Sequence, residues 1–215
     1  MMDTRRRFIK QCITVVGLAG LTVTGGVRRL WAAVRRIILP AGTDGTSLRN
    51  RSPEELDTRH LAPTPIEQFD TMGQTEYDVP LSAWRLEIRG AVANPRSLTY
   101  EDILKLRPIE KKVLLICPGV FSYVGVWKGA SLLKLLQEAG LKPGAEKIKA
   151  FGPRNGSSRK EETFSLAELE EDRVFLAYAV NGQTLPEKHG FPLRIVAEDR
   201  YGDDWVKYLT EIRVL

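Results

Sequence analysis

The chain has 215 residues, of which 43% are hydrophobic and 27% charged, so it can form a packed core and is not disordered throughout. Its net charge of +5 is concentrated at the N-terminus: eight Lys/Arg and one Asp give residues 1–36 a charge of +7, which leaves −2 for residues 37–215. This distribution removes the main argument for nucleic-acid binding, and it confines attraction to anionic membranes to the N-terminal segment.

The N-terminal segment is typical of an export leader. It reads Thr4-Arg5-Arg6-Arg7-Phe8-Ile9-Lys10 and continues into an apolar stretch, residues 11–27. An Arg pair followed by Phe, an aliphatic residue and Lys resembles a twin-arginine signal, which exports proteins that have already folded around a cofactor. A basic N-terminus before a short membrane anchor is the alternative interpretation.

The sequence is compatible both with cleavage of this leader and with its retention as an anchor. The apolar stretch is at the lower limit of the length that spans a bilayer, and no clear Ala-x-Ala cleavage site follows it. Residues 28–39 combine Arg pairs with Trp31, a composition typical of a segment at a membrane interface. We therefore expect a periplasmic protein, either released by cleavage or associated with the membrane through residues 11–36.

Residues 37–80 are predicted to form an extended segment that wraps around the rest of the chain. They are rich in Gly, Pro, Ser, Thr, Asp and Glu and show little periodicity. Short periodic runs begin after residue 80 and predict a folded domain over residues 81–215.

Strands and short helices alternate irregularly through this domain. The apolar or alternating runs that predict strands are 84–89, 113–116, 148–151, 174–180, 193–197 and 205–215. Capping residues predict short helices at 99–106, 131–139 and from 165, and Asn181-Gly182 predicts a hairpin turn after residue 180. This mixture favours an α+β fold with a mixed sheet over a doubly wound parallel sheet.

Cys117 is the first candidate for chemistry. It is one of two cysteines, the other being Cys12 in the leader, and it ends an apolar strand run just before a Pro-Gly turn. A strand end is a rigid mount that presents a side chain to a cleft. On the residues alone, an inert buried thiol is the commoner interpretation, and a nucleophilic pair with His189 is the other. The chain has too few Cys and His residues for a zinc site made from its own side chains.

Two cations are the second candidates. Arg194 and Lys207 lie within runs that otherwise predict buried strands. A buried cation needs an anionic partner, which is either a protein carboxylate such as Asp203, Asp204 or Glu198, or a ligand.

Four motifs in order resemble one known family. The order is the strand ending in Cys117, then Trp127-x-Gly129-x-x-Leu132, then Asn181-Gly-x-x-Leu-Pro with His189-Gly-x-Pro-x-Arg194, and finally Tyr201-Gly-x-x-x-Val206-Lys207. This order is similar to the molybdopterin-binding catalytic domain of the sulfite oxidase family, and most similar to its exported bacterial methionine sulfoxide reductase subunits. The resemblance covers about residues 62–215 and identifies residues 81–215 as the molybdopterin-binding catalytic domain.

The resemblance implies a cofactor and roles for individual residues. The cofactor would be molybdenum-molybdopterin, with Cys117 as the protein's thiolate ligand to the metal, a soft ligand that suits it. Catalytic roles would belong to Cys117 and Tyr201. Cofactor contacts would come from Asp70, Thr71, His189, Arg194, Trp205, Val206 and Lys207, with Lys207 on the pterin phosphate.

The resemblance also implies the reaction and the partners. We expect two-electron oxygen-atom transfer on a small substrate, a sulfoxide or a sulfite-like oxyanion, in which the cofactor carries the chemistry. Because the chain has no Cys-x-x-Cys-His haem motif, its electrons would come from a separate protein, such as a membrane haem protein or a quinone-linked protein. The alternatives are a non-catalytic pterin-binding or structural module of the same fold and a cysteine hydrolase using Cys117 and His189.

Overall fold

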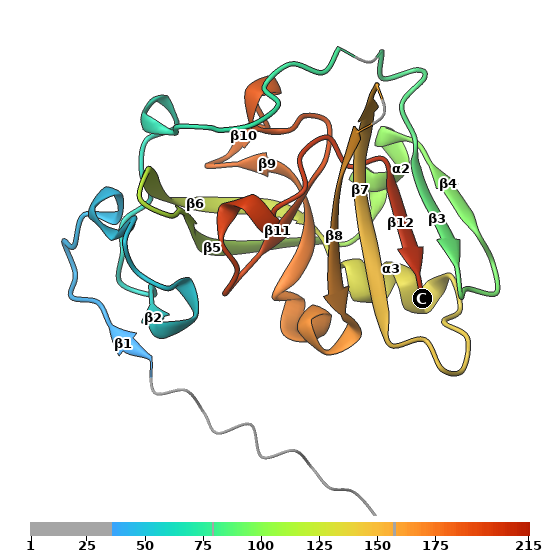
Figure 1. Cartoon of the computed structure of the whole chain (residues 1–215), viewed down its shortest axis with the longest axis horizontal. Helices are drawn as coiled ribbons and strands as arrows, with labels where there is room; N and C mark the ends of the chain where they lie inside the picture. Colours follow the sequence, from blue (N-terminus) through green and yellow to red (C-terminus); the bar gives the residue numbers. More distant parts are fainter. Residues whose placement is uncertain (1–35, 79, 157) are drawn as a thin grey trace, which may run out of the picture. The chain divides into compact units, whose positions relative to one another are not determined.

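The computed structural model describes residues 36–78, 80–156 and 158–215 (Figure 1). These residues belong to one compact unit that begins at residue 35. Apart from Arg36, the predicted leader lies outside the described residues. In the part of the chain that is described, no helix has both the length and the apolar character needed to cross a bilayer.

Strands account for most of the described secondary structure, and the helices are short. The strands are β1 (Ile37–Ile38), β2 (Leu56–Asp57), β3 (Leu86–Gly90), β4 (Arg96–Leu98), β5 (Pro108–Cys117), β6 (Phe121–Ala130), β7 (Lys147–Asn155), β8 (Ser158–Ser165), β9 (Val174–Val180), β10 (Gln183–Thr184), β11 (Arg194–Ala197) and β12 (Glu211–Val214). The α-helices are α2 (Tyr100–Lys105) and α3 (Leu132–Glu138). The 3₁₀ helices are η1 (Gly45–Leu48), η2 (Pro53–Glu55), η3 (Ile66–Gln68), η4 (Leu166–Asp172), η5 (Glu187–His189) and η6 (Gly202–Asp204).

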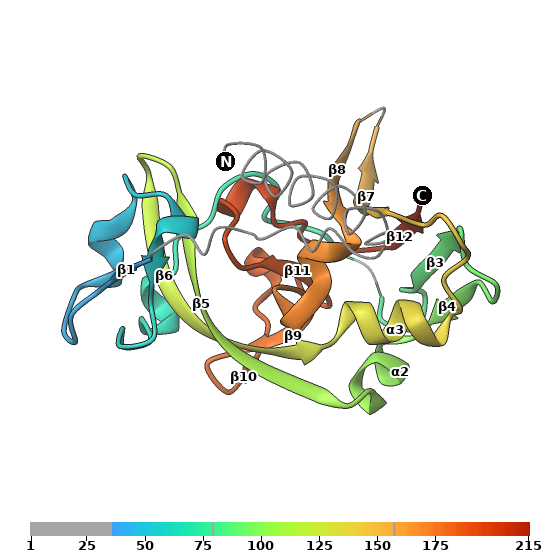
Figure 2. The same cartoon turned by 90° about the horizontal axis from the view of Figure 1, so that it is seen from below.

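Two five-stranded sheets form the body of the described residues. The first has the strand order β10-β9-β6-β5, with β11 also paired to β9, and all of its pairs are antiparallel. The second has the order β4-β3-β12-β7-β8, in which β3 and β12 are parallel and the other pairs are antiparallel (Figures 1 and 2). The predicted α+β fold with a mixed sheet is therefore confirmed.

Strand β5 is buried on both of its faces. Val113 and Leu115 belong to the main core, whereas Leu114 and Ile116 belong to a smaller cluster with Leu39, Leu48, Leu56 and Leu61. Side chains alternate between the two faces of a strand, so two apolar environments explain why the run 113–116 is continuously apolar. The segment that supplies the second environment, residues 37–64, lies beside β5 and β6 in both views (Figures 1 and 2).

Hydrogen bonds fix this segment to β6. Thr64 N donates to Val124 O over 2.8 Å, and Val124 N donates to Thr64 Oγ1 over 3.1 Å. Ser122 Oγ donates to Gly45 O over 2.7 Å, and both groups are buried. The division of the chain into a wrapping segment (37–80) and a catalytic domain (81–215) stays a prediction.

Several local predictions are confirmed. Thr99 and Asp102 form a capping box at the start of α2, and Ser131 caps α3. Asn181 and Gly182 have φ angles of 49° and 75°, as a two-residue turn between β9 and β10 requires. The short helix predicted from Ser165 is the 3₁₀ helix η4, with its capping box in place.

Several segments differ from the prediction, which included none of the strands β4, β6 and β8. Strand β6 was not predicted, because consecutive residues from Ser122 to Gly125 are all buried and leave no alternating pattern. The strand predicted over 205–215 was placed too early, since β12 begins only at Glu211. Tyr208 has a φ of 53°, a left-handed conformation that interrupts an extended strand. Lys207 is therefore a loop residue and not part of a buried strand.

Gly129 provides a test of how β6 meets β9. A Cβ atom at this position would lie 1.6 Å from Leu176 O, at a register shift between the two strands. We expect Gly129→Ala to lower the free energy of unfolding by at least about 3 kcal/mol, measured by urea denaturation. Gly144→Ala is the control, because Gly144 has a φ of 86° but no atom within 4 Å, so only about 1–2 kcal/mol of backbone strain is expected. Equal losses in the two variants would contradict this account of the strand pairing.

Candidate functional site

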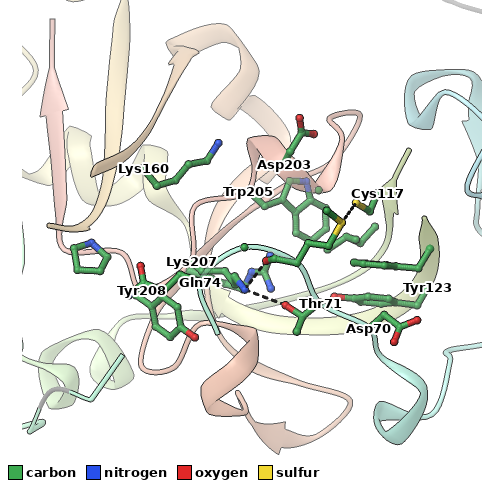
Figure 3. A pocket seen from close by; sticks show the side chains of 17 residues that line it. Asp70, Thr71, Gln74, Cys117, Tyr123, Lys160, Asp203, Trp205, Lys207 and Tyr208 are labelled. Carbon is green, nitrogen blue, oxygen red and sulfur yellow. Dashed lines mark hydrogen bonds between the residues drawn. The ribbon is translucent and has the colours of Figure 1, made fainter. Parts of the chain in front are cut away.

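A cavity of about 370 Å³ opens where the ends of β5 and β6 meet the segments 70–74 and 202–208. Figure 3 shows Cys117 and Tyr123 on one side of this cavity and Lys207 and Tyr208 on the other. Its lining residues are Asp70, Thr71, Met72, Gly73, Gln74, Leu115, Cys117, Phe121, Tyr123, Pro153, Lys160, Arg194, Gly202, Asp203, Trp205, Lys207 and Tyr208.

Cys117 is held at the tip of the β5–β6 hairpin. The turn is closed by Val120 N, which donates to Cys117 O over 3.0 Å, and it is tied to the N-terminal segment by Gly119 N, which donates to Arg49 O over 2.9 Å. Burial, and to a lesser extent the negative charge of Asp203, raises the pKa of the Cys117 thiol. The free thiol is therefore protonated at neutral pH, and a bound metal would have to displace that proton.

Met72 lies against the thiol. Cys117 Sγ donates to Met72 Sδ over 3.2 Å, and Met72 is 54% exposed (Figure 3). The thioether therefore covers the thiol at the mouth of the cavity.

Arg194 is a buried cation without a carboxylate partner among the described residues. It lies on β11, is only 2% exposed, and donates through Nη1 to His189 O over 2.8 Å. Its guanidinium lies 5.1 Å from the ring centroid of Trp127 and 5.3 Å from that of Trp205. Burial lowers the pKa of Arg194, which means that its charge is desolvated and not neutralised.

Lys207 is a second cation without a carboxylate partner among the described residues, and its side chain is half-buried. Its Nζ donates to Thr71 Oγ1 over 2.9 Å, to Met72 O over 3.0 Å and to Lys188 O over 3.2 Å, all of them uncharged acceptors (Figure 3). Burial first, and the charge of Arg194 second, lowers the pKa of Lys207 to about 8. Lys207 and Arg194 both line the cavity and destabilise each other's charge, so an anionic group bound there would stabilise both.

Two of the acids considered as partners for these cations bind other residues. Glu198 accepts from Lys111 Nζ over 2.7 Å, and Asp204 accepts from Arg200 Nη1 over 3.4 Å. Asp203 lines the same cavity, and its charge acts on Cys117. Among the described residues, therefore, neither Arg194 nor Lys207 forms an ion pair with these acids, as the purely structural alternative requires.

Three polar atoms beside the cavity are buried and have no hydrogen-bond partner among the described residues. They are His189 Nδ1, His189 Nε2 and Tyr208 Oη. Buried polar groups are usually satisfied, so atoms of this kind indicate a missing partner such as a ligand or a water molecule. Burial, followed by the charges of Arg194, Lys188 and Lys207, lowers the pKa of His189 to about 3, so the imidazole is neutral.

The structure brings most of the predicted site residues together. Asp70, Thr71, Cys117, Arg194, Trp205 and Lys207 all line the cavity. His189 is buried behind it, with its ring 5.7 Å from Phe69 and 6.4 Å from Tyr123. Val206 is fully buried, and Tyr201 packs against the smaller apolar cluster; neither is among the lining residues. The roles of Val206 and Tyr201 stay predictions.

Sequence reasoning missed the aromatic wall of the cavity. Phe121 and Tyr123 stack with ring centroids 5.9 Å apart, and Phe69 stacks on Tyr123 at 3.9 Å. Alternation across the hairpin would have found Phe121 and Tyr123, because Cys117 pairs with Phe121 and Leu115 with Tyr123. That signal was hidden because β6 was not recognised as a strand.

Comparison with known proteins identifies a family. The model of the "oxidoreductase molybdopterin binding domain" matches residues 73–215. The chain is 32% identical over 160 residues to the protein-methionine-sulfoxide reductase catalytic subunit MsrP of Gluconobacter oxydans, covering 67% of this chain and 50% of that protein. It is 30% identical over 142 residues to the uncharacterized oxidoreductase YuiH of Bacillus subtilis, covering 66% of this chain and 70% of that protein.

A plant enzyme and a solved structure extend the comparison. The sulfite oxidase of Arabidopsis thaliana is 30% identical over 167 residues, which cover 63% of this chain and 42% of that enzyme. The sulfane dehydrogenase SoxCD of Paracoccus pantotrophus is structurally similar, with a TM-score of 0.59 and 26% identity over 64% of this chain and 39% of that chain. The alignments thus span about half or less of the MsrP, sulfite oxidase and SoxCD chains.

The lowered pKa of His189 predicts how the stability of the cofactor-free protein depends on pH. Between about pH 6.5 and about pH 3 the unfolded chain binds a proton that the folded chain does not, so the free energy of unfolding should fall as the pH falls through this window. One such group contributes a slope of at most about 1.4 kcal/mol per pH unit. Urea denaturation at about pH 7.5 and about pH 5.5 measures this change in the free energy of unfolding. Most carboxylates titrate below this pH range and contribute little to the difference. In His189→Gln, which cannot titrate, the loss between these two pH values should be smaller; an unchanged loss would show that His189 is not the responsible group.

Proposed function

Since the chain belongs to the oxidoreductase molybdopterin binding domain family, its cofactor is molybdenum-molybdopterin, and we propose that it catalyses two-electron oxygen-atom transfer from a small, neutral sulfoxide. The observation that carries this proposal is the arrangement of the cavity. The cavity is lined by one thiol, that of Cys117, and by two cations, Arg194 and Lys207, that no carboxylate neutralises among the described residues. Figure 3 shows Cys117 and Lys207 on different sides of it.

The residues present fit this cofactor. Cys117 would ligate the molybdenum through Sγ, and Arg194 and Lys207 would bind the phosphate of the pterin. The partnerless atoms of His189 and Tyr208 are available for hydrogen bonds to the polar ring system. When bound, the cofactor supplies the two-electron redox chemistry of oxygen-atom transfer.

The chain's own residues would bind and orient both reactants. Lys207 Nζ would exchange its carbonyl acceptors, Met72 O and Lys188 O, for phosphate oxygens, which form stronger charge-assisted bonds. Neutral His189 can donate a hydrogen bond from one ring nitrogen and accept one at the other. Burial raises the pKa of Tyr123 to about 12, although Arg194 acts in the opposite direction, so its hydroxyl keeps its proton.

A neutral substrate suits the surroundings of Cys117. The apolar or aromatic side chains of Leu115, Phe121 and Met72 line the cavity together with Cys117, and the charge of Asp203 acts on the thiol. Lys160 also lines the cavity, but its Nζ pairs with Glu162 Oε1 over 2.5 Å. A sulfite dianion would be repelled by Asp203, whereas a sulfoxide carries no net charge and has an apolar body. The name of the Gluconobacter relative agrees with this substrate class.

Export and electron supply complete the proposal. The twin-arginine-like leader supports export of the folded protein to the periplasm, either as a cleaved form or as a form anchored through residues 11–36. Reduction of one sulfoxide to a thioether and water consumes two electrons and two protons. The electrons would come from a separate electron-transfer protein, and water would supply the protons.

The proposed function is tested by metal content and turnover. We expect the purified holoenzyme to contain molybdenum and to reduce dimethyl sulfoxide or methionine sulfoxide with an artificial electron donor, and to oxidise sulfite much more slowly. Cys117→Ser should abolish turnover while lowering the free energy of unfolding by only about 1 kcal/mol. A molybdenum-loaded wild type without turnover would favour the non-catalytic module, and full turnover in Cys117→Ser would disprove the ligand assignment.

The phosphate role of Lys207 has a matched control in Lys160, a second lysine that lines the cavity. Charge-assisted hydrogen bonds are worth about 1.5–3 kcal/mol, so Lys207→Gln should weaken cofactor retention by about one to two orders of magnitude. Pterin content after dialysis measures this loss, which Lys160→Gln should not show. Melting temperatures add a second criterion, since Lys207→Gln should lower that of the holo form more than that of the apo form. Full pterin occupancy with equal shifts in both forms would overturn the phosphate role.

A further inference from the structure

A second pocket, of about 440 Å³, lies on the outer face of the β4-β3-β12-β7-β8 sheet. We call it the arginine pocket, because its wall contains four arginines. They are Arg85, Arg89 on β3, Arg159 on β8 and Arg213 on β12. Residues 87, 89, 211 and 213 alternate with the buried Leu86, Ile88, Ile212 and Val214, so the arginine-bearing face is the one turned away from the core.

Two carboxylates neutralise only part of this charge. Arg89 Nη2 donates to Glu87 Oε2 over 3.0 Å. Arg159 Nη1 and Arg213 Nη2 share Glu211, at 2.9 Å and 2.7 Å.

Arg85 Nη1 donates to the backbone carbonyls of Ser82 and Trp84. Four guanidinium groups and two carboxylates therefore leave the pocket lining with a charge of +2, whereas residues 37–215 as a whole carry −2. A local patch of the opposite sign to the body attracts a partner with an acidic surface.

The arginine pocket adjoins the cofactor cavity. Tyr77 lines the pocket and Tyr208 lines the cavity, and the centroids of their rings are 5.4 Å apart. A second link runs through the backbone, because Arg159 Nε donates to Gly152 O over 2.7 Å and a Cβ at Gly152 would lie 3.2 Å from Lys207 O. One pair of aromatic rings thus connects a positively charged surface to the cavity that would hold the pterin.

We propose that the arginine pocket docks an acidic one-electron carrier protein, which passes electrons to the cofactor cavity through the Tyr77–Tyr208 pair. This inference rests on the proposed function, whose reaction consumes two electrons per sulfoxide. Two encounters with the reduced carrier supply them, each encounter oxidising one carrier molecule. The aromatic link is the reason to favour a redox protein over an acidic protein of another kind.

The docking surface is tested by reversing its charge. Arg89 and Arg213 have side chains that are 61% and 49% exposed, so R89E/R213E should fold normally. The control is K128E/K134E, which has the same change in net charge, at exposed lysines on β6 and α3 that line neither pocket and have no ion pair among the described residues. The probe is a reduced plant-type [2Fe–2S] ferredoxin, an acidic one-electron carrier.

Stopped-flow mixing of the holoenzyme with the ferredoxin measures the second-order rate of electron transfer. We expect the wild-type rate to fall as salt is raised, R89E/R213E to be slower by about tenfold or more at low salt, and K128E/K134E to match the wild type. Turnover with a small-molecule donor should be the same in all three. Equal rates in R89E/R213E and K128E/K134E, or a salt-independent wild-type rate, would overturn the proposal.

Two further measurements are needed. One separates the electron route through Tyr77 from the docking of the carrier, and the other separates this inference from the proposed function. Tyr77→Leu should slow electron transfer at saturating ferredoxin without weakening binding, and Tyr77→Phe should retain the rate; an unchanged rate in Tyr77→Leu would overturn the route.

Equilibrium binding of ferredoxin, followed by titration calorimetry, does not depend on turnover. If no sulfoxide is reduced but R89E/R213E alone loses ferredoxin binding, the docking surface stands and only the proposed function fails. Inorganic phosphate at millimolar concentration is added as a competitor. If phosphate displaces ferredoxin from the wild type, while R89E/R213E binds ferredoxin as tightly as the wild type does, the pocket is a small-anion site and the docking surface is overturned.

Discussion

The candidate site depends on one costly feature, the guanidinium of Arg194, which is buried without a carboxylate partner among the described residues. Two indole rings and backbone carbonyls surround it, and these groups compensate the loss of hydration only in part. Burial is the larger cause of the lowered pKa values of His189 and Lys207, and the charge of Arg194 lowers both further, so this one guanidinium acts on two other groups of the site. A bound anion would stabilise a buried charge of this kind. The cavity is therefore better understood as a ligand-binding site than as part of the hydrophobic core.

The parts of the fold that the sequence predicted are those fixed by local chemistry. The capping box of Thr99 and Asp102, the Ser131 cap and the Asn181-Gly182 turn each depend on residues only a few positions apart. The strand that ends at Cys117 was predictable for a related reason, because an apolar run that stops at a Pro-Gly turn has few other conformations. The residues of the cavity that lie in sequence motifs were accordingly found.

The parts that were missed depend on contacts between distant segments. Strand β6 lost its alternating pattern because residues 37–64 bury its second face, and no local signal reveals such a cover. Lys207 appeared to belong to a strand, although the left-handed conformation of Tyr208 places it in a loop. The arginine pocket gathers side chains from β3, β8 and β12, which are separate in sequence and become neighbours only through the sheet order. Its charge was invisible in a body whose net charge is negative.

The burial of β5 on both faces has a consequence for the order of folding. Residues 37–64 leave the ribosome before the rest of the body, yet the partners that they bind, such as Ser122 and Val124, are 60 or more residues further along the chain. This segment therefore cannot reach its final place until the β5–β6 hairpin has been synthesised, and the part of the body made earliest is among the last to be fixed. Contacts of such long range slow folding and prolong the exposure of apolar strands, so a nascent chain of this design needs protection until the hairpin emerges.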